Sequence, residues 1–283
     1  MTGLESTHGG ATAHVDAFGL TDVGKVRQQN EDQFAIARLS RSLRLAHTSL
    51  ENVSTFERFG QTAADLFVVA DGVGGVAGGE LASGTAVQAL TEYIAQTAGC
   101  YYNVDVTGEH EFLDRLEQAA RHAHDRVRAF SSKGQGPATT LTMVTLLWPR
   151  AYIVHIGDSR GYHLRGDRLR QFTRDQTMGE LLADEGVVTE QQARDSGLDN
   201  VLVSAVGAEI TPSIGVLDLR YDDTLLLCSD GLTKHVADEQ IAGILRGAAN
   251  ATAACEQLVQ AALDDGGSDN VTVVVARMGR PTG

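Results

Sequence analysis

The chain has 283 residues, of which 42% are hydrophobic and 21% are charged, as is typical of an ordered globular protein. Acidic residues outnumber basic ones by 37 to 23, and the formal net charge is −14. Such a charge repels phosphate backbones and anionic lipid, so we expect neither nucleic acid nor a membrane among the partners.

The cysteines and the N-terminal segment bear on the compartment. Cys100, Cys228 and Cys255 are widely spaced and contain no CxxC pair, so neither a disulfide framework nor a zinc site is indicated. The N-terminal segment has no basic start followed by an apolar run, and no apolar stretch is long enough to span a bilayer. We therefore expect free thiols in a reducing, cytoplasmic location.

Short runs rich in β-branched and aliphatic residues predict strands. In chain order they lie at about residues 33–37, 66–70, 139–148, 151–156, 224–228 and 271–276. Two tight turns, at Pro149-Arg150 and Gly166-Asp167, predict antiparallel pairing of the segments on either side of each turn.

Periodic segments between these strands predict helices. Besides Glu80–Ala95, an apolar stripe from Phe112 to Phe130 predicts a helix, and two more are expected at Asp238–Arg246 and Thr252–Leu263, with their first residues as N-caps. His122 and His124 lie off the stripe, and we expect them to face solvent rather than to bind metal.

The order of elements predicts the fold class. Strands, helices and antiparallel strands follow one another without a repeating βαβ pattern, which indicates an α+β protein. No Pro-rich or Ser-rich linker and no internal repeat divides the chain. We expect one domain over residues 1–283, with its core at about 15–278.

Carboxylates recur at the ends of the predicted strands. Asp71 follows LFVVA, Asp158 follows YIVHIG, Asp230 follows TLLLCS, and Asp269 precedes NVTVVV. Each one alone is more typical of a turn or a cap. Together they place several acids on loops at strand ends, where a rigid sheet can hold polar groups in a common cleft.

Converging carboxylates repel one another unless cations lie among them, so the cluster predicts metal. All-oxygen ligands select hard ions such as Mg²⁺ or Mn²⁺. Glu31 and Asp32 add two acids at the start of a strand, and Arg27 precedes Glu31 by four residues. A lone arginine is more often a surface ion pair, but beside these acids its guanidinium can grip a phosphate in a bidentate fork. The pattern predicts hydrolysis of a phosphate ester by a metal-activated water.

The segments GKVRQQNED, VVADGVGG, ATTLT, GDSR, SDGL and SDNVTVVV resemble, in this order, the motifs of metal-dependent protein Ser/Thr phosphatases of the PP2C type (the PPM family), above all the stand-alone bacterial members. The resemblance extends from about Asp22 to Ala276. It implies a four-layer α/β/β/α sandwich of two antiparallel sheets, with metal ions in a cleft at one edge. It also implies phosphorylated protein substrates, including a cognate Ser/Thr kinase and its targets.

The same resemblance implies two tight Mn²⁺ or Mg²⁺ ions and a third, looser one. Asp71 would bridge the tight ions, with the Gly72 carbonyl on one ion and with Asp230 and Asp269 on the other. Asp158 would help to bind the third ion.

Four further residues would act around the ions. Asp32 and Glu31 would hold metal-bound waters, and Asn270 would support the ligands from behind. Arg27 would bind the phosphate of the substrate.

The sequence departs from the family pattern in three places. In the family's mobile flap, here at about residues 174–207, QTMG and DSGLDN replace the familiar motifs, so substrate preference cannot be transferred. Val73 and Val76 occupy places where relatives commonly carry a histidine, and we expect His155 to be a packed strand residue rather than its replacement. The segment at 38–65 is longer than in compact relatives, with no role assigned.

Three functions remain open at this stage. The leading one is a phosphoprotein phosphatase acting on phosphoserine and phosphothreonine. The alternative is a catalytically weak pseudophosphatase that binds a phosphoprotein or a kinase, against which the filled ligand positions argue. A two-metal nuclease or phosphodiesterase conflicts with the acidic charge.

Overall fold

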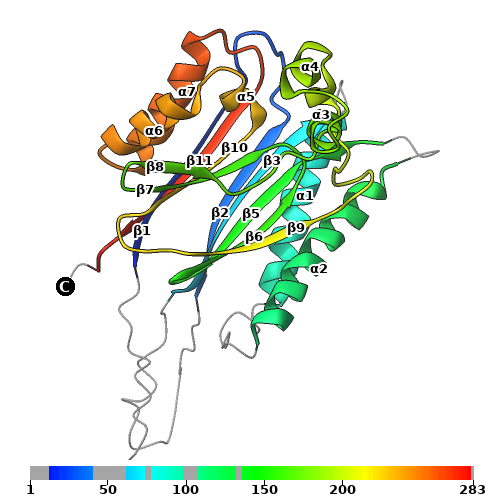
Figure 1. The fold of residues 1–283 in the computed structure, drawn as a ribbon. Helices are drawn as coiled ribbons and strands as arrows, with labels where there is room; N and C mark the ends of the chain where they lie inside the picture. The colour runs from blue at the N-terminus through cyan, green and yellow to red at the C-terminus, as the bar shows by residue number, and fades with distance from the viewer. Residues whose placement is uncertain (1–12, 41–61, 74–77, 98–107, 132–135, 282–283) are drawn as a thin grey trace, which may run out of the picture.

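The computed structural model describes residues 13–40, 62–73, 78–97, 108–131 and 136–281. Two antiparallel sheets pack face to face, and helices cover the outer side of each (Figure 1). The strands of the first sheet are, in spatial order, β1 (His14–Asp22), β11 (Val271–Gly279), β10 (Thr224–Cys228), β7 (Arg160–Arg165) and β8 (Arg168–Gln171). Those of the second are β2 (Asp32–Ser40), β3 (Thr62–Val73), β5 (Leu141–Leu147), β6 (Arg150–Ile156) and β9 (Ser213–Asp218), and β4 (Ala138–Thr139) pairs with β3.

The helices form the two outer layers. Helices α1 (Gly78–Gln96) and α2 (Glu109–Arg128) cover the second sheet, and α5 (Asp230–Thr233), α6 (Asp238–Gly247) and α7 (Ala251–Asp264) cover the first (Figure 1). Between β8 and β9 lie α3 (Met178–Asp184), α4 (Glu190–Asp195) and a 3-10 turn (Leu198–Asn200), within the segment predicted as the flap. The predicted α+β sandwich of four layers is confirmed.

Alternation along β3 divides its side chains between two apolar cores. Leu66 and Val68 pack toward α1 and α2, whereas Phe67 and Val69 pack between the two sheets. Successive strand residues point to opposite faces, so Asp71 continues the row of Phe67 and Val69. Near its C-terminal end, this strand therefore places a carboxylate at the edge of the core between the sheets.

The sequence prediction of β3 was too short. Asp71 was expected just after the strand, but β3 continues to Val73 because Gly72 and Val73 pair with Thr139 and Ala138 of β4. That pairing also interrupts the strand predicted at 139–148, since β4 and β5 are separated at Thr140. Strands β1 and β9 were not predicted.

Some local predictions were wrong. Helix α6 is preceded by Ala237 rather than capped by Asp238, and Asn250 rather than Thr252 caps α7 by accepting from the Ala253 N–H. His124 is buried instead of solvent-facing, and its Nδ1 accepts a hydrogen bond from the Gly207 N–H at 3.1 Å.

The predicted hairpin at Gly166-Asp167 joins β7 to β8, and Gly166 adopts the positive φ that this turn requires. Cys228 and Cys255 are free thiols, as predicted, and both are buried, whereas Cys100 lies outside the described residues. Within the described ranges, no helix has both the length and the apolar character needed to cross a membrane.

Candidate active site

Asp32 and Asp71 lie opposite each other at the edge where the core between the sheets ends. Asp32 is the first residue of β2, and the antiparallel register pairs it directly with Asp71 of β3. Like charges placed opposite each other on neighbouring strands are destabilising. The fold nevertheless positions this pair through main-chain pairing, and main-chain pairing is rigid.

The backbone around Asp71 is held by the threonines of the ATTLT motif. The Asp71 N–H donates to Thr140 Oγ1 at 2.9 Å, and Thr139 Oγ1 donates to the Asp71 carbonyl at 2.8 Å. A Cβ on Gly72 would lie 2.4 Å from the backbone of Gly79, so a glycine is required there. These bonds use backbone groups and leave the Asp71 carboxylate free to act.

Three more acids reach the same place from the ends of other strands. Asp158 follows β6, Asp230 begins α5 directly after β10, and Asp269 precedes β11. Together they line a cavity of about 290 Å³, which we call the carboxylate cavity. Its lining includes nearly all the residues predicted for the site: Arg27, Glu31, Asp71, Gly72, Asp158, Asp230, Asp269 and Asn270.

Asn270 connects the carboxylate cavity to the loop between β1 and β2. Its Oδ1 accepts from the Glu31 N–H, and its Nδ2 donates to the carbonyls of Val23 and Gln29, each at 2.9 Å. The loop that carries Arg27 is therefore held against the start of β11. The support of metal ligands expected of Asn270 stays a prediction.

Asp32 is the predicted site residue that is absent from the cavity wall. It is only 2% exposed, and Ser229 Oγ donates to its Oδ2 at 2.7 Å, whereas its Oδ1 has no hydrogen-bond partner among the described residues. Burial raises the pKa of Asp32 to about 6, against the opposing influence of the Ser229 and Thr272 hydroxyls. A buried carboxylate oxygen without a partner is costly unless a cation or an ordered water satisfies it.

Burial and mutual repulsion also raise the pKa values of the other carboxyls. The pKa of Asp71 lies well above its ordinary value because of burial and then of the charges on Asp32, Asp230 and Asp158. Burial and the charge of Asp230 raise the pKa of Asp158 to about 7. Burial raises the pKa of Asp230 as well, although Lys234 opposes the shift.

Two cationic side chains balance part of this negative charge. Arg27 forks onto Asp269, with Nε 2.8 Å from Oδ1 and Nη2 3.0 Å from Oδ2. Lys234 Nζ lies 2.6 Å from Asp230 Oδ2 and 2.8 Å from Asp269 Oδ2. Although burial opposes it, the hydrogen bonds from Lys234 and Arg27 hold the pKa of Asp269 below its usual range.

The acidic side chains around the cavity are oxygen donors, which suit a hard divalent ion, but they are not grouped closely enough to coordinate one. Over the described ranges, no three Asp, Glu, His or Cys side chains are grouped closely enough to hold an ion. Two of the predicted ligands, Asp230 and Asp269, are instead engaged by Lys234 and Arg27. The unpartnered Oδ1 of Asp32 and the raised pKa values of the carboxyls show that a cation would be stabilising here, and the oxygen-only donors favour Mg²⁺ or Mn²⁺ over softer metals.

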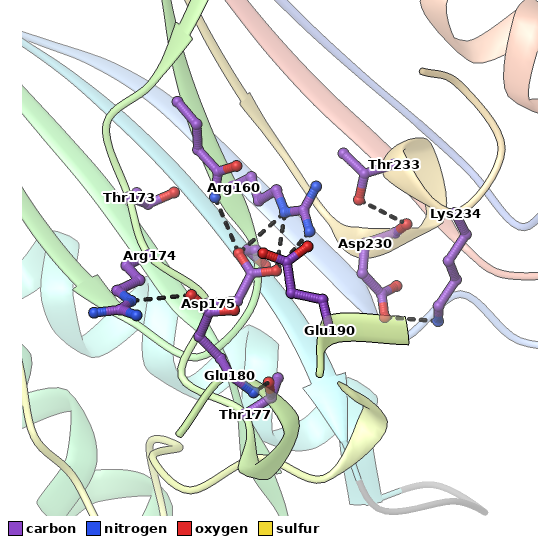
Figure 2. A network of polar contacts seen from close by, with 12 residues as sticks. Arg160, Thr173, Arg174, Asp175, Thr177, Glu180, Glu190, Asp230, Thr233 and Lys234 are labelled. Carbon is purple, nitrogen blue, oxygen red and sulfur yellow. Dashed lines mark hydrogen bonds and ion pairs between the residues drawn. The ribbon is translucent and has the colours of Figure 1, made fainter. Parts of the chain in front are cut away.

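An ion pair between Arg160 and Asp175 anchors the start of the flap beside this site. Arg160, at the start of β7, forks onto Asp175, with Nη2 2.7 Å from Oδ2 (Figure 2). Thr177 then caps α3 by accepting from the Glu180 N–H. A second cavity of about 490 Å³ lies under α3 and α4, and both Asp230 and Lys234 contribute to its wall.

The places considered for a proton donor contain no free histidine. Val73 is 41% exposed beside the carboxylate cavity, and Val76 lies outside the described residues. His155 is a packed strand residue, as predicted, because it is 1% exposed and both ring nitrogens are hydrogen-bonded, Nδ1 to Thr142 Oγ1 and Nε2 to the Arg174 carbonyl.

Sequence reasoning missed several residues of the site. Ser229, Lys234 and the pair of Arg160 with Asp175 were assigned no place in it, although GDSR and SDGL were recognised as motifs. The spacing of Lys234, four residues after Asp230, was the one available signal, because on a helix that spacing puts the two side chains together.

Comparison with known proteins identifies the family. The family model described as protein phosphatase 2C matches residues 56–266, most of the chain. The chain belongs to this family. It is 38% identical over 217 residues to the serine/threonine protein phosphatase PstP of Mycobacterium tuberculosis, covering 75% of this chain and 40% of that relative. It is 30% identical over 264 residues to the protein phosphatase PhpP of Streptococcus pneumoniae, covering 92% and 96% of the two chains.

Solved structures agree with this assignment. The catalytic domain of PstP in complex with two manganese ions superposes with a TM-score of 0.71 at 32% identity, covering 94% of this chain and 98% of that one. This chain spans 40% of the length of full PstP, so the likeness concerns the phosphatase domain of that protein.

Proposed function

We propose that this protein is a metal-dependent phosphatase that hydrolyses phosphoserine and phosphothreonine in proteins. The observation that carries the proposal is the convergence of five predicted acids, from five separate segments, on one cavity that Arg27 also lines. Membership of the protein phosphatase 2C family supports the same activity. Acids held together by sheet pairing against their own repulsion are typical of a site that binds cations for catalysis.

The proposed metal ligands are the residues at the strand ends. Asp71, with the Gly72 carbonyl, would share two divalent ions with Asp230 and Asp269, and Asp158 would serve a third, looser ion. When bound, the ions would supply a water made acidic enough to attack phosphorus.

Residues of the chain itself would orient the attacking water and bind the phosphate. Asp32 has a free, buried Oδ1 with which to orient a water, and Glu31 is held beside it through its backbone contacts with Asn270 and Gly72. Arg27, whose side chain is 51% exposed, can turn its guanidinium from Asp269 to a phosphate.

The deciding experiment measures release of phosphate from a phosphothreonine peptide and from an aryl phosphate with Mn²⁺, with Mg²⁺ or with EDTA. We expect turnover with either ion and none with EDTA. Tight binding of the phosphopeptide without turnover in either metal would favour the pseudophosphatase alternative. A cytoplasmic location and a cognate Ser/Thr kinase among the substrates stay predictions from the sequence.

A further inference from the structure

Lys234 occupies an unusual position for a lysine, because its ammonium group lies between two carboxylates that the proposed function assigns to one ion. It follows the short helix α5, and its Nζ reaches Asp230 Oδ2 at 2.6 Å and Asp269 Oδ2 at 2.8 Å. Asp230 and Asp269 come from segments on either side of α6 and α7, so Lys234 is the bridge between them. Figure 2 shows the contact with Asp230.

We propose that Lys234 is a tethered cation that competes with a divalent ion for Asp230 and Asp269. In the metal-free protein its ammonium neutralises the two acids and keeps them from repelling each other. An ion that binds both carboxylates has to displace the ammonium group. The inference rests on the proposed function only for the assignment of Asp230 and Asp269 as ligands.

The surroundings of Lys234 allow that displacement. Its side chain is 35% exposed, so the ammonium can leave without crossing a packed core. Lys234 also lines the second cavity of about 490 Å³, whose wall carries Glu190 and Asp199 from the flap. A released ammonium would therefore enter water beside other acids, which limits the cost of its departure.

Competition predicts a specific effect on metal affinity. The apparent affinity of a ligand falls in proportion to the fraction of protein that can accept it, so an ammonium in place about nine-tenths of the time weakens the ion about tenfold. The two proposed ions should differ in affinity accordingly. Occupancy of the weaker one would then follow the free Mn²⁺ concentration.

The test is calorimetric titration of metal-free protein with Mn²⁺ and no substrate, for the wild type and for Lys234→Met. Methionine keeps an unbranched side chain, one atom shorter, and removes the charge. We expect the variant to bind the weaker ion at least about tenfold more tightly than the wild type does. Lys25→Met is the matched control, since Lys25 is an exposed lysine whose backbone is bonded to Gly267, near Asp269; its loss should change affinity less than threefold.

Thermal unfolding gives a second readout, which should differ between the metal-free and the metal-bound protein. In EDTA the Lys234→Met variant should melt at a lower temperature than the wild type, because Asp230 and Asp269 lose their cation. In excess Mn²⁺ that deficit should vanish. A purely structural role would lower the melting temperature in both conditions, and that result would overturn the proposal.

Equal Mn²⁺ affinity in Lys234→Met and wild type would also overturn it. If Lys234→Met does not fold, Lys234→Gln offers the same charge change with a polar end group. Failure of the proposed function is distinguishable, because it would appear as absent phosphopeptide turnover while the calorimetric difference persists. Loss of the difference alongside normal turnover would refute only the role of Lys234.

Discussion

Asp32→Asn should stabilise the metal-free protein, although it removes a residue placed at the active site. Burial raises the pKa of Asp32 from 3.8 to about 6, so above pH 7 the folded protein holds an ionised carboxylate that the unfolded chain would solvate better. A rise of the pKa from 3.8 to about 6 corresponds to about 3 kcal/mol. Asparagine removes the charge and keeps an oxygen for the Ser229 hydroxyl.

The sign of the pH dependence follows from the raised pKa. Because the folded state binds the proton of Asp32 more tightly than the unfolded chain does, the stability that this proton contributes is complete below about pH 4 and is lost as the pH rises through about 6. The gain from Asp32→Asn should therefore be near zero at pH 4 and reach about 2 to 3 kcal/mol at pH 8, which is roughly 5 to 10 °C in melting temperature.

Urea unfolding in EDTA at pH 4, 6 and 8 measures this gain directly. In excess Mn²⁺ the gain should disappear, since bound cations offset the repulsion and stabilise the wild type by mass action. A variant that is stabilised equally at pH 4 and pH 8, or not at all in EDTA, would refute the claim that the ionised Asp32 carboxylate destabilises the metal-free fold.

The remaining predictions concern the reaction and its ions. Asp71→Asn should abolish turnover and remove the tight Mn²⁺ sites seen by calorimetry, and near-normal turnover at saturating Mn²⁺ would contradict its place as the bridging ligand. Asp158→Ala should lower the rate yet leave the two tight ions, which metal counting checks; loss of every site would disprove the assignment to a third ion. Arg27→Ala should cost about 2 to 4 kcal/mol in kcat/KM on a phosphopeptide if its fork engages the phosphate, and a loss below tenfold would make it a surface ion pair. Rates on a series of aryl phosphates should fall steeply as the pKa of the leaving group rises, because no histidine lines the described part of the carboxylate cavity; a shallow slope with chemistry limiting the rate would require another proton donor.

The positions of the carboxylates around the cavity could be predicted because each carboxylate is marked by a short local pattern in the sequence. An acid at the end of an apolar strand is visible in a few residues, as at Asp230 after TLLLC or Asp269 before VTVVV. Sheet pairing then brought those strand ends together, as the antiparallel order had indicated. The extension of β3 through Asp71 was missed, because it depends on pairing with β4, far along the chain.

Contacts between distant segments could not be predicted in the same way. His124 lies off the apolar stripe of α2 and was expected in solvent, but the end of the flap packs there and supplies the Gly207 N–H. Asn250 and Thr252 are both good capping residues two positions apart, and propensity alone does not choose between them. Lys234 was overlooked for a related reason, since one of its two partners, Asp269, lies 35 residues away.

The charges around the cavity reconcile the two interpretations of Arg27. With all six carboxyls ionised, Asp32 and the five acids of the cavity wall would exceed the two cationic side chains, Arg27 and Lys234, by four negative charges. Two divalent ions would balance that charge, and ions bound by Asp269 would take its oxygens from both side chains. Arg27 would then lose its partner at the moment when a phosphate dianion needs one. The surface ion pair and the phosphate fork would thus be successive states of one side chain, with Asp269 as its partner before the ions bind and the substrate after.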